Sequence, residues 1–349
     1  MKASSQTSIL IIYTGGTIGM TRNRETGALE SFDFEHLRGN VPEMSNFDYH
    51  IEAITLNPPI DSSDMEPSHW AKMARLIEKN YETYDGFVIL HGTDTMAYTA
   101  SALSFLLQGL AKPVVITGSQ IPIGQLRTDG KENFLTSIEI AAAKDKEGHA
   151  MVPEVCIYFE SQLMRGNRTT KINSEGFNAF RSFNFPCLAN AGIDIKYDTH
   201  LVRRPPSGSR LKVESAMDNR IIVVSLFPGI REDILSSMLH VESLRGVILK
   251  TYGSGNAPQK PWLMHTLEEL CRRGVVVVNV TQCKTGSVQM RRYETGLQLL
   301  HAGVLNGFDC TIEAMVTKMM FLLGRNLPLD ETKRLMCQNI AGEITLPNE

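Results

Sequence analysis

Two threonines stand directly after glycines, where apolar runs give way to polar loops. Thr17 ends the sequence Thr-Gly-Gly-Thr, and Thr93 lies within His-Gly-Thr-Asp. A threonine hydroxyl is a poor nucleophile at neutral pH and needs a base beside it. A lysine can serve when desolvation lowers its pKa well below about 10.4, and Lys171 is the best candidate because we expect its strand to end at the same edge. With Asp94 holding the lysine, Thr93, Lys171 and Asp94 would follow the logic of a serine hydrolase triad.

Each of these residues also has an ordinary structural explanation. A glycine turn followed by a threonine often serves only local hydrogen bonding, and Asp94 could cap a helix that begins at Met96. Lys171 could be an exposed surface lysine. His91 adjoins the second threonine loop, but a histidine at the end of a strand is more often packed and hydrogen-bonded than catalytic. We therefore expect no catalytic role for His91.

A third polar loop, Asp61-Ser62-Ser63-Asp64, lies between a predicted strand and a predicted helix. Pro67 follows it closely, and proline is favoured just inside the start of a helix. Backbone N–H groups at such a place can hold a carboxylate. Because ligands of open α/β sheets bind in the crevice at the carboxyl ends of the strands, the threonine that follows the first glycine turn is expected to point its hydroxyl into that crevice.

Short apolar runs alternate with helical periodicity through the first half of the chain. The sequence predicts strands at residues 9–13, 49–56, 86–90, 113–117 and 154–159. It predicts helices at about 67–81, at 96–108 and near 132–143. This alternation implies a mainly parallel sheet that is covered on both faces.

The pattern changes at residues 194–219, which include Arg-Arg-Pro-Pro-Ser-Gly and show no lasting periodicity. We interpret this stretch as a linker between an N-terminal catalytic domain, residues 1–193, and a C-terminal domain, residues 220–349. Three further strands are expected in the second domain, at residues 221–226, 246–249 and 274–280. The fold class is therefore α/β, with a larger N-terminal parallel-sheet domain and a smaller C-terminal α/β domain.

The composition is that of an ordinary globular protein. The 349 residues are 42% hydrophobic and 21% charged with a net charge of −3, which gives no electrostatic reason to expect a nucleic-acid or membrane partner. Six cysteines are scattered without a CxxC or Cys/His ligand spacing, so we expect neither a metal site nor a disulfide framework. The N-terminal apolar run is too short for a signal peptide or a membrane span, which favours a cytoplasmic protein.

Thr14-Gly-Gly-Thr-Ile-Gly19 and His91-Gly-Thr-Asp-Thr95 resemble the two signature motifs of the bacterial-type L-asparaginases. The resemblance covers nearly the whole chain and includes residues 61–65, 167–171 and 253–258. Within that family, the Ser62-Ser63 pair and the missing export signal resemble the cytosolic type I branch.

This resemblance implies an amidohydrolase without a cofactor, which converts L-asparagine to L-aspartate and ammonia through Thr17 as nucleophile and an acyl-enzyme. Thr93, Asp94 and Lys171 would then be a second triad that handles water and protons. The residues implied to hold the substrate's α-amino and α-carboxylate groups are Asp61, Ser62, Ser63, Gly92 and Asp94. Ser119 would line the pocket, and Asn256 would come from a neighbouring subunit, so the chain would work as a homodimer or a dimer of dimers.

The resemblance also implies a second asparagine site near the dimer interface, formed by Thr170, Lys250 and Cys283. Some type I enzymes carry arginine where this chain has Lys250. A lysine keeps the charge but lacks the planar fork that clamps a carboxylate. Lys250 could equally be a strand-end residue near the subunit contact, so we expect any effector site to be weakened.

One departure from the family pattern concerns the tyrosine that many members carry on a lid about ten residues after the nucleophile. This region reads Gly27-Ala28-Leu29-Glu30 here. Water, the Lys171 triad or another group of the lid would then activate Thr17.

Three other functions compete with asparagine hydrolysis. The related subunit of a tRNA-dependent amidotransferase carries an extra N-terminal domain, whereas this chain starts directly at its first strand. A non-catalytic asparagine sensor would have no need of activated hydroxyls. A dinucleotide-binding oxidoreductase is disfavoured because Gly15-Gly-Thr-Ile-Gly19 does not fit G-x-G-x-x-G.

Overall fold

The computed structural model describes residues 6–22, 29–31 and 39–346. The chain forms two compact units that divide between Ser215 and Ala216. In the described part, no helix is both long enough and apolar enough to cross a membrane.

The first unit is built on an eight-stranded sheet in the order β13-β12-β9-β8-β7-β5-β1-β4. Its strands are β1 (Ser8–Tyr13), β4 (His50–Thr55), β5 (Gly86–Leu90), β7 (Val114–Thr117), β8 (Val155–Phe159), β9 (Gln162–Arg165), β12 (Ala189–Ala191) and β13 (Ile195–Tyr197). The strands from β4 to β8 are parallel, and β9, β12 and β13 pair antiparallel. The expected parallel sheet is thus confirmed for its central strands.

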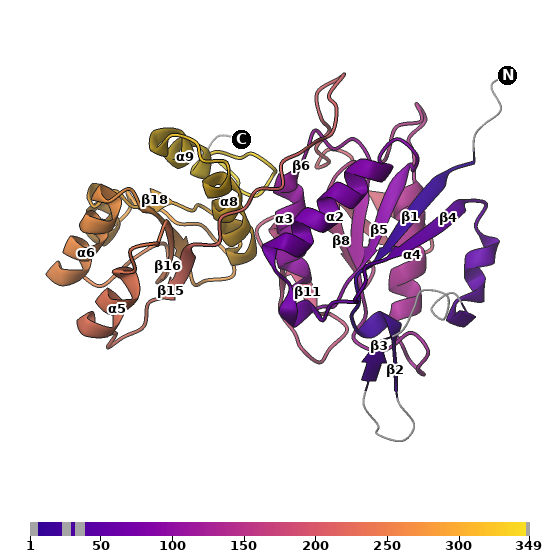
Figure 1. The fold of residues 1–349 in the computed structure, drawn as a ribbon, viewed down its shortest axis with the longest axis horizontal. Coiled ribbons are helices and arrows are strands. Elements are labelled where there is room, and N and C mark those ends of the chain that lie inside the picture. The colour runs from indigo at the N-terminus through magenta and orange to yellow at the C-terminus, as the bar shows by residue number, and fades with distance from the viewer. Residues whose placement is uncertain (1–5, 23–28, 32–38, 347–349) are drawn as a thin grey trace. The chain divides into compact units, whose positions relative to one another are not determined.

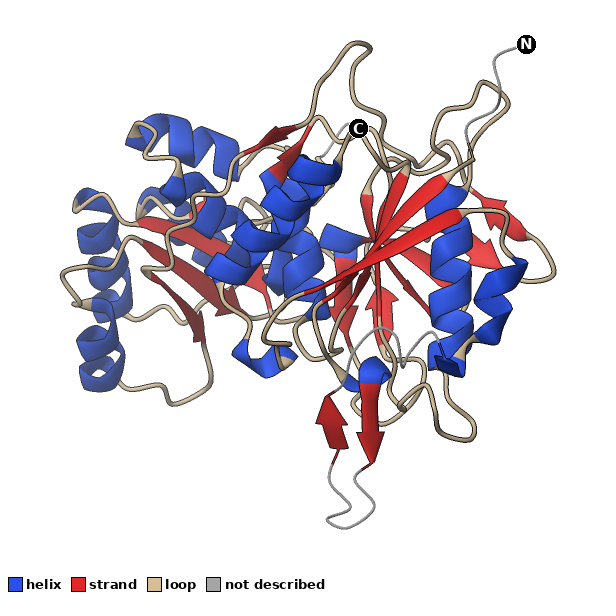
Figure 2. Cartoon of the chain, turned by 45° about the vertical axis from the view of Figure 1, so that its right-hand side comes forward, coloured by secondary structure: helices blue, strands red, loops and turns tan. Residues whose placement is uncertain are grey.

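Helices cover both faces of this sheet (Figures 1 and 2). They are α2 (Pro67–Asn80), α3 (Met96–Leu106) and α4 (Gly130–Ala142). Ile9 and Ile11 of β1 share one core cluster with Phe134 and Ile138 of α4, while the intervening Leu10 is also fully buried. The runs of consecutive apolar residues in the central strands follow from this double covering, because neither face of a strand meets water.

Several short elements refine the predicted plan. Between the predicted strands at 9–13 and 49–56 lie the antiparallel pair β2 (Met20–Arg22) and β3 (Leu29–Ser31) and the 3-10 turn η2 (Pro42–Asn46). The stretch expected to be a linker contains β13, which pairs with β12, and β14 (Lys212–Val213), which pairs with β6 (Leu107–Gln108). Two short segments of that stretch are therefore strands paired within the first unit.

The second unit has a four-stranded parallel sheet in the order β15-β16-β17-β18. Its elements are β15 (Ile221–Ser225), β16 (Gly246–Thr251), β17 (Val276–Thr281), β18 (Leu305–Asn306), α5 (Glu232–Leu239), α6 (Pro261–Arg272), α7 (Glu294–His301), α8 (Ile312–Gly324) and α9 (Leu329–Met336). Lys318 of α8 is completely buried and its Nζ lies 2.6 Å from Glu343 Oε1. The same ammonium donates to the carbonyls of Met336 and Gln338, so each of its three N–H groups has an acceptor.

Candidate active site

Two glycines bring the loop after β1 against the loops that follow β4 and β5. Gly15 and Gly16 have φ angles of +123° and +91°, which glycine adopts at little cost. A Cβ on Gly16 would lie 2.4 Å from the backbone nitrogen of Gly92, and a Cβ on Gly15 would lie 2.4 Å from the carbonyl oxygen of Ile60. Only glycine, which has no Cβ, permits these close contacts. They hold the loop of Thr17 against the loop of Thr93.

Thr17 begins the 3-10 turn η1 (Thr17–Gly19) and is partly exposed. Gly92 is buried, and a Cβ there would lie 2.5 Å from Ser62 Oγ. The chain around Gly92 therefore lies against both Gly16 and Ser62. Ser119, which follows β7, is also buried and donates its hydroxyl to the Ile121 carbonyl at 2.7 Å.

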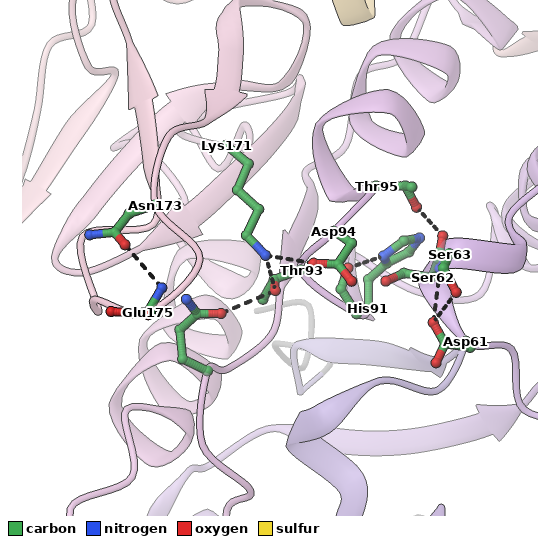
Figure 3. Close-up of polar contacts among 12 residues, drawn as sticks. Asp61, Ser62, Ser63, His91, Thr93, Asp94, Thr95, Lys171, Asn173 and Glu175 are labelled. Carbon is green, nitrogen blue, oxygen red and sulfur yellow. Dashed lines mark hydrogen bonds and ion pairs between the residues drawn. The ribbon is translucent and has the colours of Figure 1, made fainter.

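The predicted set of hydroxyl, lysine and carboxylate is in contact (Figure 3). Lys171 Nζ lies 2.8 Å from Thr93 Oγ1 and 2.7 Å from Asp94 Oδ1. The Lys171 side chain is 17% exposed and that of Asp94 is 66% exposed, so the set opens to solvent on the Asp94 side. Asp94 pairs with Lys171, and Thr95 occupies the N-cap position of α3. The roles of the three groups in catalysis stay a prediction.

Lys171 reaches the site by a different path from the expected one. After β8 the chain turns back as the antiparallel strand β9, passes through η4 (Gly166–Arg168) and enters β10 (Thr169–Lys171). This strand pairs with β11 (Phe180–Ser182) in a separate two-stranded ribbon. The strand that ends at Lys171 is thus β10 of this ribbon and not a strand of the main sheet.

Gln120 is a residue of the site that the sequence reasoning missed. Thr93 Oγ1 donates to Gln120 Oε1 at 3.1 Å, while Gln120 Nε2 donates to the Gly176 carbonyl at 3.2 Å. The backbone N–H of Gln120 donates to the Asp129 carboxylate. The signal was its place just after the strand that ends at Thr117, because ligands of open α/β sheets bind at the carboxyl ends of the strands.

The loop that contains Asp61 carries a negative charge near the contact between Gly16 and Gly92. Asp61 Oδ1 accepts from the backbone N–H of Ser63 at 2.9 Å and from its hydroxyl at 2.8 Å. These hydrogen bonds hold the pKa of the Asp61 carboxyl below its usual value, so it is ionised at neutral pH. Thr95 Oγ1 donates to the Ser62 carbonyl at 2.6 Å and ties this loop to the start of α3.

His91 is packed, as expected. It is completely buried, its Nδ1 lies 2.6 Å from the Gly92 carbonyl, and its Nε2 lies 2.8 Å from Thr99 Oγ1. Burial lowers the pKa of His91 to about 4, so the imidazole is neutral near pH 7.

Of the remaining predicted residues, Thr170 lies in the first unit and the others lie in the second. Asn256 lies in the second unit, in the turn that follows β16, and its Oδ1 accepts from Thr295 Oγ1 at 2.7 Å. Lys250 lies in β16, and Cys283 is exposed just after β17. Thr170 is buried in β10 of the first unit. Their joint role as an effector site stays a prediction.

The segment that lacks the tyrosine of the family, Gly27 to Glu30, lies partly outside the residues that the structure describes. Gly27 and Ala28 lie there, while Leu29 and Glu30 begin β3. Among residues that the structure describes, no group of three or more His, Cys, Asp or Glu side chains is placed to hold a metal ion.

Family models match both units of the chain. The model described as "Asparaginase, N-terminal" matches residues 8–203, and that of the "Glutaminase/Asparaginase C-terminal domain" matches residues 220–336. L-asparaginase 1 of Escherichia coli K12 is 44% identical over 343 residues, which cover 97% of this chain and 98% of that protein.

Two further similarities extend this finding. The crystal structure of L-asparaginase I from Vibrio cholerae has a TM-score of 0.88 and 42% identity, with 98% of this chain and 100% of that chain covered. A glutamyl-tRNA(Gln) amidotransferase subunit of Pyrococcus horikoshii is 32% identical over 354 residues, which cover 97% of this chain and 76% of that protein.

Proposed function

The chain belongs to the asparaginase family, and we propose that it hydrolyses the side-chain amide of L-asparagine to give L-aspartate and ammonia. The observation that carries this proposal is the contact of the two threonine loops. Gly16 lies against Gly92, so Thr17 and Thr93 extend from adjoining stretches of backbone at one edge of the sheet. Lys171 supplies a basic group at 2.8 Å from one of these hydroxyls.

In the first half of the proposed reaction, Thr17 Oγ attacks the carbon of the substrate's side-chain amide. The C–N bond breaks, the hydroxyl proton passes to the departing nitrogen, and ammonia leaves an ester on Thr17. In the second half, water attacks this ester, and aspartate leaves as the threonine hydroxyl is restored. Each half needs a group that accepts and returns a proton, and the contact of Lys171 Nζ with Thr93 Oγ1 supports Lys171 as that group.

The α-ammonium and α-carboxylate groups of asparagine fit the polar groups near the contact between Gly16 and Gly92. The ionised Asp61 is suited to the α-ammonium group, because an ammonium donates charge-assisted hydrogen bonds to a carboxylate. The other residues assigned to the α-amino and α-carboxylate groups are Ser62, Ser63, Gly92 and Asp94. In this assignment Ser119 lines the pocket and Asn256 is contributed by a second copy of the chain. The working unit is then a homodimer, or a dimer of dimers, located in the cytoplasm.

The test is release of ammonia from L-asparagine and L-glutamine, measured side by side with the purified chain. Thr17→Val and Thr93→Val are nearly isosteric and should each reduce turnover by several orders of magnitude. Thr317→Val, a substitution at a buried helix position of the second unit, is the control that should keep turnover. Near-normal turnover in Thr17→Val, with a native circular dichroism spectrum, would remove Thr17 from the mechanism.

Other outcomes of this assay separate the competing functions. Tight asparagine binding without ammonia would indicate a sensor. Ammonia release that appears only with an added amidotransferase partner and its tRNA would indicate the subunit function.

The effector site is the remaining part of the proposal. With Thr170 beside Lys171 in β10, an asparagine bound at Thr170, Lys250 and Cys283 would order the proposed base. Because lysine lacks the bidentate fork of arginine, the rate should depend on asparagine concentration hyperbolically or with slight sigmoidality. Lys250→Arg should increase cooperativity or lower the half-saturating concentration. Steep sigmoidality in the natural chain that Lys250→Arg leaves unchanged would refute this.

A further inference from the structure

Three buried side chains next to the proposed triad form a chain of hydrogen bonds that the mechanism above does not use. Trp70 of α2 is 4% exposed, and Thr99 of α3 and His91 after β5 are both 0% exposed. Trp70 Nε1 lies 2.9 Å from Thr99 Oγ1, which lies 2.8 Å from His91 Nε2. The chain ends where His91 Nδ1 meets the carbonyl oxygen of Gly92 at 2.6 Å.

The direction of every hydrogen bond in this chain follows from its end groups. A carbonyl oxygen only accepts, so His91 Nδ1 carries the proton and donates to Gly92. A neutral imidazole with its proton on Nδ1 has Nε2 as an acceptor, so the Thr99 hydroxyl donates to it. The indole N–H of Trp70 only donates, and it donates to the oxygen of that hydroxyl. Donors and acceptors are thus matched from α2 to the site.

The last of these bonds fixes a peptide group of the site. Its acceptor is the carbonyl of the Gly92–Thr93 peptide, which is planar and carries its N–H on the opposite side from its C=O. With the carbonyl held on the buried imidazole, rotation of this peptide is prevented and the Thr93 N–H is directed away from His91. Thr93 and Asp94, the two residues that contact Lys171, follow directly in the chain (Figure 3).

We propose that Trp70, Thr99 and His91 are a positioning relay, which sets the orientation of the Gly92–Thr93 peptide and thereby the placement of Thr93 and Asp94 against Lys171. The relay transfers no proton during turnover. It rests on the proposed function, because its effect is read as turnover of asparagine.

An acid–base role for the imidazole is a poorer explanation of the same contacts. Both ring nitrogens are engaged by groups of the relay, and the ring is closed off from solvent. Burial also lowers the pKa of His91 to about 4, so the ring is neutral at pH 7 and holds no imidazolium proton to act as a general acid. The function of the ring is therefore to connect Thr99 to the Gly92 carbonyl.

Substitutions at Thr99 and Trp70 test the relay without touching the triad. Thr99→Val keeps the shape but removes the hydroxyl, and it should lower kcat for asparagine about tenfold or more, because small misplacements of reacting groups have large effects on rate. KM should also rise, because Gly92 and Asp94 are assigned to substrate binding, but by less than kcat falls, since Asp61, Ser62 and Ser63 lie outside the relay. Thr99→Ser restores the hydroxyl and should recover most of kcat. Trp70→Phe removes only the first donor and should give a smaller loss.

Thr317→Val is the matched control, because Thr317 is also 0% exposed, lies within a helix and donates its hydroxyl to a carbonyl. It should lose stability without losing kcat. A direct readout is the ¹⁵N spectrum of histidine-labelled protein, in which His91 should carry its proton on Nδ1 at pH 7.

The possible failures are distinguishable. If the natural chain does not hydrolyse asparagine, the proposed function is overturned. If it does, the relay alone is overturned by any of three results: kcat in Thr99→Val no lower than in Thr317→Val, equal losses in Thr99→Ser and Thr99→Val, or a His91 proton on Nε2. Should Thr99→Val fail to fold, Trp70→Phe and the histidine spectrum still decide, because either an unchanged kcat in Trp70→Phe or a His91 proton on Nε2 overturns the proposal.

Discussion

Replacing Gly16 with alanine should separate the two threonine loops. The added Cβ would lie 2.4 Å from the Gly92 nitrogen and 2.5 Å from its Cα. These atoms belong to backbone, so they cannot swing aside as a flexible side chain would. Moving the Cβ out to an ordinary contact of 3.4 Å shifts one loop by about 1 Å relative to the other, and a displacement of that size at a reacting group costs about 100-fold in rate.

Gly16→Ala also forces a residue with a side chain into a positive φ, and a control variant measures this conformational cost separately. Gly16 has a φ of +91° and a ψ of 171°, a backbone region that is essentially restricted to glycine, and a residue with a side chain there costs about 1–3 kcal/mol. Gly148 has a φ of +84°, and a Cβ on it would meet nothing within 4 Å. Gly148→Ala therefore carries the conformational cost without the clash.

The assay compares kcat at saturating asparagine and the free energy of unfolding in the two variants. Gly148→Ala should lose about 1–2 kcal/mol of stability and keep its kcat. Gly16→Ala should lose at least as much stability, and its kcat should fall by about 100-fold. If Gly16→Ala keeps kcat within about threefold of the natural chain, the loop contact does not position Thr17 and the reasoning is refuted.

Three further predictions follow from buried or paired charges. Lys171→Arg should abolish turnover as completely as Lys171→Met, with asparagine binding retained in titration calorimetry, because a guanidinium does not give up its proton at usable pH; an active arginine variant would show that only the charge matters. The pKa of His91 is about 4 in the folded protein against 6.5 when unfolded, so between these values only the unfolded chain takes up the proton. Folding stability should therefore fall by about 3 kcal/mol as the pH drops from about 6.5 to about 4, and urea midpoints that fall equally in His91→Gln would contradict this origin. Lys318→Met leaves the buried Glu343 carboxylate without its cation and should destabilise the second unit by about 3–5 kcal/mol, whereas adding Glu343→Gln should recover part of that loss in a double-mutant cycle.

The sequence was sufficient for the parts of the fold that local pattern determines. Central strands such as β1 and β5 are buried on both faces, so each is an unbroken apolar run that soon gives way to a glycine turn. The loops after them were found for the same reason, and the carboxyl ends of parallel strands bring those loops to one edge.

The parts that were missed depend on contacts between distant segments or on unusual turns. The hairpin of β8 and β9 turns at Glu160 and Ser161, with φ angles of +46° and +61°, where Asn-Gly or Asp-Gly would have signalled a turn. Without that signal, the separate ribbon of Lys171 was not predicted. The bond between Trp70 and Thr99 joins residues 29 positions apart on two helices, and no periodicity in either helix reveals it.

The ribbon that carries Lys171 is joined to the first unit differently from the loops that carry Thr17 and Thr93. Thr17 and Thr93 follow strands held in continuous ladders, whereas β10 pairs with β11 through three residue pairs, Thr169–Ser182, Thr170–Arg181 and Lys171–Phe180. Short ladders open at lower free energy than the body of a sheet. We therefore expect that on gradual warming Lys171 separates from Thr93 while the main sheet remains folded. Activity that is lost below the melting temperature and regained on cooling would show this.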